Sequence, residues 1–177
     1  MGHVNAVQDV KLFAGITFQD ERTLANVQQL LEHRFGEIDM QSPIFDFTFT
    51  TYYAVEMGAA LQKVFWSFSL LIPPEKLVDA KLFSNNIEAR FATHDGKRTI
   101  NIDPGYLSNG NIVLATTKNF AHRVYLGKGI YGDMHMIFRH NQFHPLEWTY
   151  PDYSQPLAMD FFLKIREIYR TTSKGRK

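Results

Sequence analysis

Polar side chains that could carry chemistry gather most densely between residues 101 and 133 of the 177-residue sequence. Asp103 closes a predicted strand directly before a Pro-Gly pair, and strand ends that feed loops are where scaffolds often place reactive side chains. His122 can supply a proton near neutral pH and Asp103 can orient its ring, so these two residues are the catalytic candidates. The structural alternative is that Asp103 forms the turn, its carboxylate accepting hydrogen bonds from backbone N–H groups.

Cationic and aromatic residues of the same region predict a ligand that carries negative charge. Lys118 provides a point charge, and the guanidinium of Arg123 can bind a phosphate or carboxylate through two parallel hydrogen bonds. Tyr125 and Lys128 complete this group of candidate ligand-binding residues, and Glu56 follows a predicted strand from which it can face the same cleft. In the alternative interpretation these side chains are solvated, protect a sheet edge or stand exposed on a short helix.

Convergence of these candidates depends on one turn in the chain. The strand that ends at Asp103 and the strand that follows it are expected to be antiparallel neighbours, which places Lys118 at the far end. A turn at residues 119–120 must therefore fold His122 and Arg123 back toward Asp103. We predict that it does, and that these residues face one concave site.

Several familiar catalytic and metal-binding motifs are absent from the sequence: G-x-x-x-x-G-K-[ST], G-x-S-x-G and H-E-x-x-H. Because the chain contains no cysteine, disulfides, thiolate-bound zinc, iron–sulfur clusters and a cysteine nucleophile are excluded. His140 and His144 have the spacing of two metal ligands on a helix, with His135 nearby, but this stretch predicts a hairpin in which they do not share a face. We therefore expect no metal site, and the sequence identifies no cofactor.

Composition is that of an ordinary globular protein, with 45% hydrophobic, 21% charged and 14% aromatic residues. The length predicts one domain over residues 1–177, with flexible ends at 1–10 and 172–177. A net charge of +1 argues against a dedicated nucleic-acid binder, which usually carries a strong basic excess. The first ten residues lack the features of a signal peptide, and no apolar run approaches the roughly 18 to 20 residues that span a bilayer. We therefore expect a cytoplasmic protein without a membrane partner.

Hydrophobic periodicity predicts the elements that must position these residues. An apolar run predicts a strand over 11–18, and an apolar stripe predicts a helix that Asp20 caps and Gly36 ends. Period-two alternation and turn residues predict the next elements: a strand over 44–50, a turn or short helix over 51–58, and a strand over 64–70.

The second half of the chain continues the same pattern. Pro73-Pro74 stop the preceding strand and begin a helix whose apolar stripe runs to Phe91, and Pro104-Gly105 are expected to end a strand over 98–103. Further segments complete the chain: strands over 111–116, 123–126, 130–138 and 143–148, a hairpin over 139–142, and a helix from Pro156. The order predicts an α+β fold with an antiparallel-rich mixed sheet, helices on one face, a ferredoxin-like βαββαβ start, extra C-terminal strands and a terminal helix.

Seven motifs give the chain a resemblance to a known family: FGEID at 35–39, TYY at 51–53, EMG at 56–58, KLF at 81–83, NIDPGYL at 101–107, LATTK at 114–118 and HRVYLGKGIY at 122–131. Together they are specific, and the chain resembles the bacterial domain-of-unknown-function 4416 family over residues 11–153. The resemblance implies a small single-domain protein without a zinc or P-loop signature. It implies no activity and no catalytic residues.

Three classes of function agree with these observations. The first is a site for a small anionic or phosphorylated ligand in a polar cleft, enzymatic or not. The second is an interaction or scaffold protein without chemistry. The third is a weak RNA-binding module that uses the sheet and the basic C-terminal residues Arg170, Lys174, Arg176 and Lys177. We place the ligand-binding site first because the polar cluster is dense and the net charge is close to zero. The sequence decides neither the ligand nor the oligomeric state.

Overall fold

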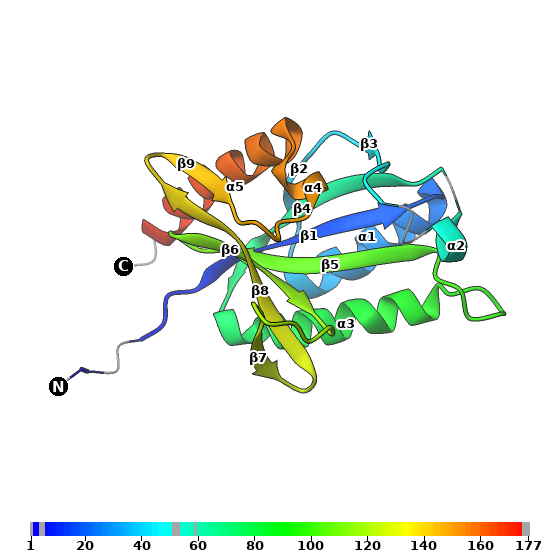
Figure 1. Cartoon of the computed structure of the whole chain (residues 1–177), viewed down its shortest axis with the longest axis horizontal. Coiled ribbons are helices and arrows are strands. Elements are labelled where there is room, and N and C mark those ends of the chain that lie inside the picture. The colour runs from blue at the N-terminus through cyan, green and yellow to red at the C-terminus, as the bar shows by residue number, and fades with distance from the viewer. Residues whose placement is uncertain (1, 4–5, 51–53, 59, 175–177) are drawn as a thin grey trace.

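The strands of the protein join in one sheet in the computed structural model, which describes residues 2–3, 6–50, 54–58 and 60–174 (Figure 1). Seven strands lie in the order β2-β4-β1-β5-β6-β8-β7, while β3 pairs with β4 and β9 pairs with β8. The strands are β1 Val10–Phe18, β2 Ile38–Gln41, β3 Phe45–Asp46, β4 Gln62–Ile72, β5 Ile100–Leu107, β6 Asn111–Thr116, β7 Val124–Gly127, β8 Ile130–Arg139 and β9 Gln142–Pro145. The helices are α1 Glu21–Phe35, α2 Ala54–Met57, η1 Pro74–Lys76 (a 3-10 turn), α3 Leu77–Arg90, α4 Pro151–Ser154 and α5 Pro156–Lys174.

Every pairing between described strands is antiparallel, and together with the helices this confirms the α+β class. The sheet therefore contains no parallel pair of the kind that a mixed sheet would have. The extra C-terminal strands and the terminal helix are present as expected. Because β3 and α2 are inserted between β2 and β4, the ferredoxin-like description of the start stays a prediction.

The central strand β1 is buried along its whole length between β4 and β5. Side chains alternate across a strand, so Leu12 and Ile16 pack toward α1 and α3, while Phe13 packs toward α5. A strand with two buried faces needs an apolar residue at nearly every position, and the sequence of β1 meets this requirement.

Local sequence explains where α1 begins and ends. The Asp20 carboxylate accepts a hydrogen bond from the Thr23 backbone N–H at 2.8 Å, which caps the first turn. At the other end the Gly36 N–H donates to the Glu32 carbonyl at 2.9 Å. Leu31 and the other apolar residues of the predicted stripe are buried against β1 and β4, as the periodicity indicates.

The expectation that all helices cover one face of the sheet is wrong for the C-terminal helix. α1 and α3 share one face, where their apolar residues belong to the same core cluster. α5 lies on the opposite face, and its Phe162 packs on Phe13 at a ring-centroid distance of 5.1 Å (Figure 1). The reason is that β1 and most of β4 are buried on both faces, so helices must cover the sheet on both sides.

The predicted end of the strand at Pro104-Gly105 is also wrong. β5 continues to Leu107, with Pro104 opposite Ala14 of β1. Pairing with β6 begins only at Gly105, so at Pro104 the strand β5 has a neighbouring strand on one side only. A strand position with one open side tolerates proline, which has no backbone N–H to donate. Asp103 therefore lies within a strand, in the stretch that β6 leaves open.

The prediction of a strand over 44–50 holds only for Phe45–Asp46, and β2 was not predicted. The expected turn or short helix over 51–58 corresponds to α2, although residues 51–53 lie outside the described part of the chain. The expected strand over 143–148 ends at Pro145, before the unpredicted helix α4. Among the described residues, no helix combines the length and apolar character that crossing a membrane requires.

Replacing Gly105 by alanine tests the close packing of β5 against β1 and β6. A Cβ at this position would lie 2.6 Å from both Phe13 Cζ and Leu114 Cδ2, and 2.8 Å from the Val113 carbonyl oxygen. We expect Gly105→Ala to lower the free energy of unfolding by about 1–3 kcal/mol, measured by urea denaturation. The control is Gly110→Ala, where nothing lies within 4 Å of the added Cβ. Equal stability of the two variants would contradict the packing argument.

Candidate functional site

Two pockets meet where Asp103, Lys118 and Tyr150 line both of them. The first, here called the aromatic pocket, has a volume of about 290 Å³ and is completed by Phe47, Phe49, Thr50, Lys63, Pro151 and Asp152. The second, here called the polar pocket, has a volume of about 260 Å³ and is completed by Lys81, Asn85, Glu88, Arg98, Asn101, Thr116 and Thr117. We call the two together the cleft. The structure thus brings Asp103 and Lys118 together, as the sequence predicts.

A glycine of the central strand lets the two sides of the cleft approach each other. Gly15 of β1 pairs with Asp103 of β5 on one side and with Phe65 of β4 on the other. A Cβ on Gly15 would lie 2.6 Å from the Tyr153 hydroxyl oxygen and 3.0 Å from Lys63 Cε. The absence of a side chain therefore leaves room for the Lys63 side chain to pass over β1 toward Asp103.

Charged side chains of α3 satisfy the backbone of β5 where β6 is missing. The buried Lys81 ammonium donates to the Ile102 carbonyl at 2.9 Å, and the Glu88 carboxylate accepts from the Ile102 N–H at 2.7 Å. Lys81 Nζ also lies 3.4 Å from Asp103 Oδ1. Burial raises the pKa of Glu88, although the Lys81 charge partly opposes this. The side chains of Lys81 and Glu88 thus make the hydrogen bonds that a neighbouring strand would otherwise make with Ile102.

Asp103 is surrounded by groups that favour its charged form. Burial by itself raises the pKa of Asp103. The charges of Lys81 and Lys63 and a hydrogen bond from Asn101 lower it by more, so the pKa lies below its usual range. The Nζ atom of Lys63 in turn lies 2.6 Å from Asp152 Oδ2. Asp103 is therefore a carboxylate at neutral pH, able to accept hydrogen bonds but poorly suited to donate a proton.

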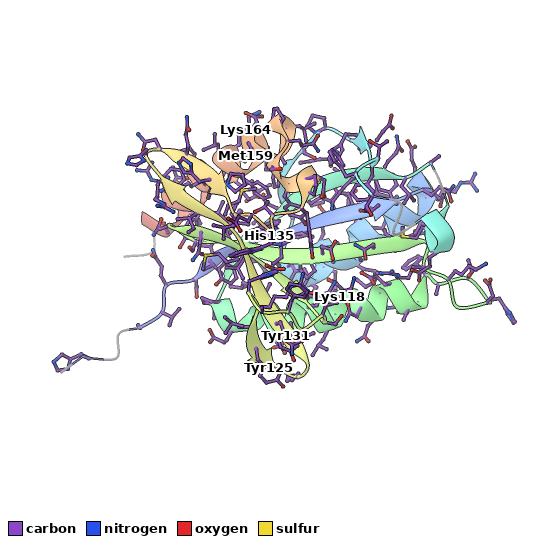
Figure 2. All side chains as sticks on the ribbon, in the orientation of Figure 1. Lys118, Tyr125, Tyr131, His135, Met159 and Lys164 are labelled. Atoms are coloured by element: carbon purple, nitrogen blue, oxygen red, sulfur yellow. The ribbon has the colours of Figure 1, made fainter. Side chains whose placement is uncertain are left out.

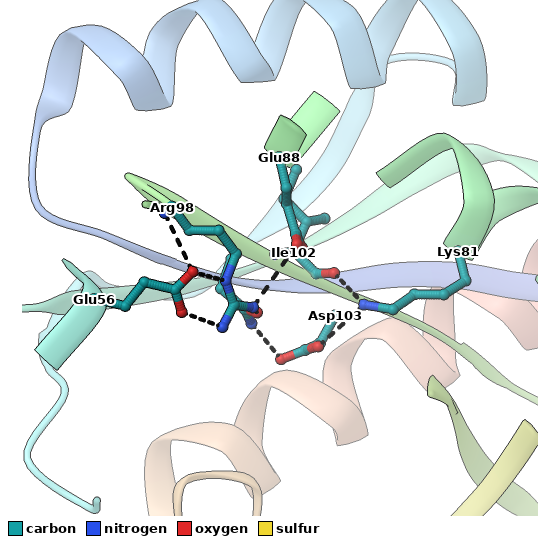
Figure 3. A network of polar contacts seen from close by, with 7 residues as sticks. Glu56, Lys81, Glu88, Arg98, Ile102 and Asp103 are labelled. Carbon is teal, nitrogen blue, oxygen red and sulfur yellow. Dashed lines mark hydrogen bonds and ion pairs between the residues drawn. The ribbon is translucent and has the colours of Figure 1, made fainter. Parts of the chain in front are cut away.

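Glu56 lies behind the polar pocket, in the network shown in Figure 3. Its carboxylate accepts two hydrogen bonds from the Arg98 guanidinium, at 2.6 and 2.9 Å, and these lower the pKa of Glu56. Arg98 also donates to Asn101 Oδ1 at 2.9 Å, and Asn101 Nδ2 donates to Asp103 at 2.7 Å. Glu56 thus anchors Arg98, and its direct contact with a ligand stays a prediction.

His122 and Arg123 meet a different carboxylate from the one that the sequence suggests. Asp133 of β8 is buried, with Arg123 Nε at 2.7 Å from Oδ2 and His122 Nε2 at 3.5 Å from Oδ1. His135 Nε2 lies 3.5 Å from Oδ2. The His122 ring also stacks on Trp148, with 4.5 Å between ring centroids. A pairing of His122 with Asp103 stays a prediction.

This cluster of Asp133, His122, Arg123 and His135 supports the cleft from outside. The Arg123 guanidinium donates to the Lys118 carbonyl at 3.0 Å and to the Tyr150 hydroxyl at 3.2 Å. Both acceptors belong to residues that line the two pockets. Arg123 therefore positions two cleft residues, while its own charge is engaged by Asp133.

Tyr125 and Lys128 lie on the β7–β8 hairpin and line neither pocket. Tyr125 is exposed and packs its ring on Tyr131, and Figure 2 shows both residues below Lys118 in that view. Lys128 Nζ lies 3.1 Å from Asp79 of α3. A direct role for either residue in ligand binding stays a prediction.

The histidines considered as metal ligands are spread apart. His135 is buried beside Asp133, His140 occupies the β8–β9 turn with a φ of 48°, and His144 lies on β9 with Nε2 3.1 Å from the Arg139 carbonyl oxygen. Within the described ranges, no group of three His, Cys, Asp or Glu residues has the arrangement needed to hold a metal ion.

Sequence reasoning missed several charged residues of the cleft, among them Lys63, Lys81, Glu88 and Arg98. A signal for two of them was present in α3. Lys81 and Glu88 lie seven residues apart on the face that also carries the buried Leu77 and Ser84. Charged residues on an otherwise buried helical face are rare, and they mark this face as unusual.

We expect Asp133→Asn to destabilise the protein at pH 7 by about 3–5 kcal/mol, because the Arg123 charge would lose its buried partner. Burial alone raises the pKa of Asp133, but His135 and Arg123 outweigh it and lower the pKa. A lowered pKa gives stability that is present above the unfolded-state value of about 3.9 and is lost as the pH falls further.

The difference in urea stability between wild type and Asp133→Asn should therefore shrink below about pH 4. Asp95→Asn is the control, because the Asp95–Lys97 pair is exposed to solvent and its loss should cost far less stability. A difference that stays constant down to pH 2 would exclude the assigned role of the Asp133 carboxylate.

Comparison with known proteins adds one identification. No curated protein and no solved structure matches the chain significantly. The model of a protein family described as a domain of unknown function matches residues 8–169, which include both sides of the cleft and the Asp133 cluster. This range is most of the chain and agrees with the resemblance seen in the motifs. The chain belongs to the DUF4416 family.

Proposed function

We propose that the cleft binds a small ligand carrying a negative charge, and the charge balance of its walls supports this most directly. Among the described lining residues, the cations are Lys63, Lys81, Arg98 and Lys118, and the anions are Glu88, Asp103 and Asp152. Because burial raises the pKa of Glu88, its negative charge is the least secure of the three. The balance favours an anion as guest.

Lys118 is the cation best placed to meet such a ligand. It is exposed and lines both pockets, whereas Lys63 and Lys81 are buried and hold Asp152 and Asp103. Its backbone N–H donates to Thr116 Oγ1 and its carbonyl accepts from Arg123, so the side chain starts from a fixed backbone position. A fixed backbone lowers the entropy lost when the side chain binds a ligand.

The energetics of burial also support a functional cleft. Burying two lysines and two carboxylates costs desolvation energy, and apolar residues of similar volume would often be equally stable or more stable. Titratable groups perturbed by both burial and neighbouring charges are enriched at functional sites. Asp103 has this character, because burial raises its pKa and the charges of Lys81 and Lys63 lower it.

The arrangement favours binding over proton transfer. Asp103 holds its charge because of the neighbouring lysines, and His122 faces Asp133. A general acid must carry a proton at the working pH, and the ionised Asp103 does not. We therefore propose a binding function and assign no reaction.

Thermal denaturation with small anions tests this proposal. The probes are inorganic phosphate, ribose 5-phosphate, the four ribonucleoside 5′-monophosphates, citrate and benzoate, each at about 10 mM. A ligand at 100 times its Kd adds about 2.7 kcal/mol, which in a chain of this size raises Tm by roughly 5–10 °C. Absence of a shift with every probe would overturn the proposal.

Lys118→Ala should remove the ligand-induced shift and change the Tm of the free protein little, because alanine keeps the backbone bonds to Thr116 and Arg123. Lys128→Ala is the matched control, since Lys128 is an exposed lysine outside the cleft. The control should retain the full shift. Retention of the shift in Lys118→Ala would show that the anion binds elsewhere.

A further inference from the structure

The aromatic pocket has the walls that a flat ring requires. Phe47, Phe49 and Tyr150 contribute aromatic faces or edges, and Pro151 adds a further apolar side. Phe49 and Tyr150 are more than one-third exposed, so their surfaces are accessible to a ligand. Stacking on such side chains is available to any planar heterocycle, because every base presents a π-face.

Asp103, at the junction of the pockets, has the properties of a hydroxyl acceptor. Its side chain is 22% exposed, and its two oxygens receive Lys81 at 3.4 Å and Asn101 at 2.7 Å. A carboxylate has about four lone-pair sites, so Asp103 can accept further hydrogen bonds from a ligand. Its lowered pKa keeps those sites available at neutral pH. Two neighbouring hydroxyls can each donate a hydrogen bond to one such carboxylate.

The polar pocket, beyond this junction, offers cations, neutral hydrogen-bonding groups and the carboxyl group of Glu88, whose pKa is raised by burial. Arg98 and Lys118 line it together with the hydroxyls of Thr116 and Thr117. Its volume of about 260 Å³ leaves room for one phosphate group with bound water. The sequence has no G-x-x-x-x-G-K-[ST] loop of the kind that holds a chain of several phosphates.

The aromatic pocket supplies aromatic walls, the polar pocket supplies Arg98, and Asp103 and Lys118 lie where the two pockets meet. We infer that the cleft binds a ribonucleoside 5′-monophosphate, with the base in the aromatic pocket, the ribose hydroxyls on Asp103 and the phosphate toward Lys118 and Arg98. This inference rests on the proposed function and narrows it to one ligand class. In that class the ribose joins the base to the phosphate, as Asp103 joins the two pockets.

Isothermal titration calorimetry with fragments of the ligand tests the inference. The probes are AMP, GMP, CMP and UMP, the 2′-deoxy form of the best of them, its nucleoside, and ribose 5-phosphate. At least one monophosphate should bind about 10-fold or more tightly than ribose 5-phosphate and than its own nucleoside. The deoxy form should also bind about 10-fold more weakly, because a site built to bond a hydroxyl rejects an analogue that lacks it.

Phe49→Ala separates the contribution of the base from that of the phosphate. It should weaken binding of the best monophosphate about 10-fold and leave ribose 5-phosphate unchanged, since only the base stacks. Tyr125→Ala is the control, because Tyr125 is an exposed aromatic residue that lines neither pocket. It should bind every probe as the wild type does.

The outcomes distinguish the inference from the proposed function. If ribose 5-phosphate, inorganic phosphate or citrate binds as tightly as every monophosphate, or if Phe49→Ala has no effect, the nucleotide inference is overturned while the anion-binding cleft stands. If no anionic probe binds, both are overturned. Asp103→Asn, once circular dichroism shows that it is folded, gives a further check. The preference for the ribose over the deoxyribose form should fall, and an unchanged preference would contradict the assigned contact.

Discussion

The open edge of β5 is the constraint from which the rest of the cleft follows. Before Gly105 this strand has β1 on one side and no β6 on the other, so the peptide groups of Ile102 need partners that a sheet would normally provide. Lys81 and Glu88 provide them from α3. Because Lys81 is held there, its charge also reaches Asp103. Ionisable side chains thus make the hydrogen bonds of this open strand edge, and they give the cleft its charged lining beside the apolar core.

Much of this architecture could be predicted from local patterns. α1 has an apolar stripe with recognisable ends, and β1 is a continuous apolar run of the length of a strand. Pro73-Pro74 mark the start of the helical segment that contains α3. The failures have physical causes. Pro104-Gly105 looks like a turn, but the missing neighbour on one side lets the strand continue through it. The alternating phenylalanines after residue 44 suggest a strand, but only Phe45–Asp46 pairs, and Phe47 and Phe49 line the aromatic pocket instead.

The candidate site was predictable only in part, because its members come from distant parts of the chain. Asp103 and Lys118 were found since they lie in the polar stretch that follows the central strands. Lys63 was not found, because its contact with Asp152 joins residues 89 positions apart. The contact of His122 with Asp133 was not predicted, because Asp133 lies across a hairpin from it and no local pattern distinguishes Asp133 from Asp103.

The two hydrogen bonds that Arg123 donates to Lys118 and Tyr150 make the Asp133 cluster and the cleft a single thermodynamic system. Any ligand that holds these two residues in place also stabilises the guanidinium that binds them, and with it the buried Asp133 pair. Linkage makes the effect reciprocal, so a change that loosens Asp133 weakens ligand affinity by the same free energy with which the ligand tightens the cluster. If the cleft binds an anion as proposed, substitutions around Asp133 should therefore change the affinity of a site that they do not touch.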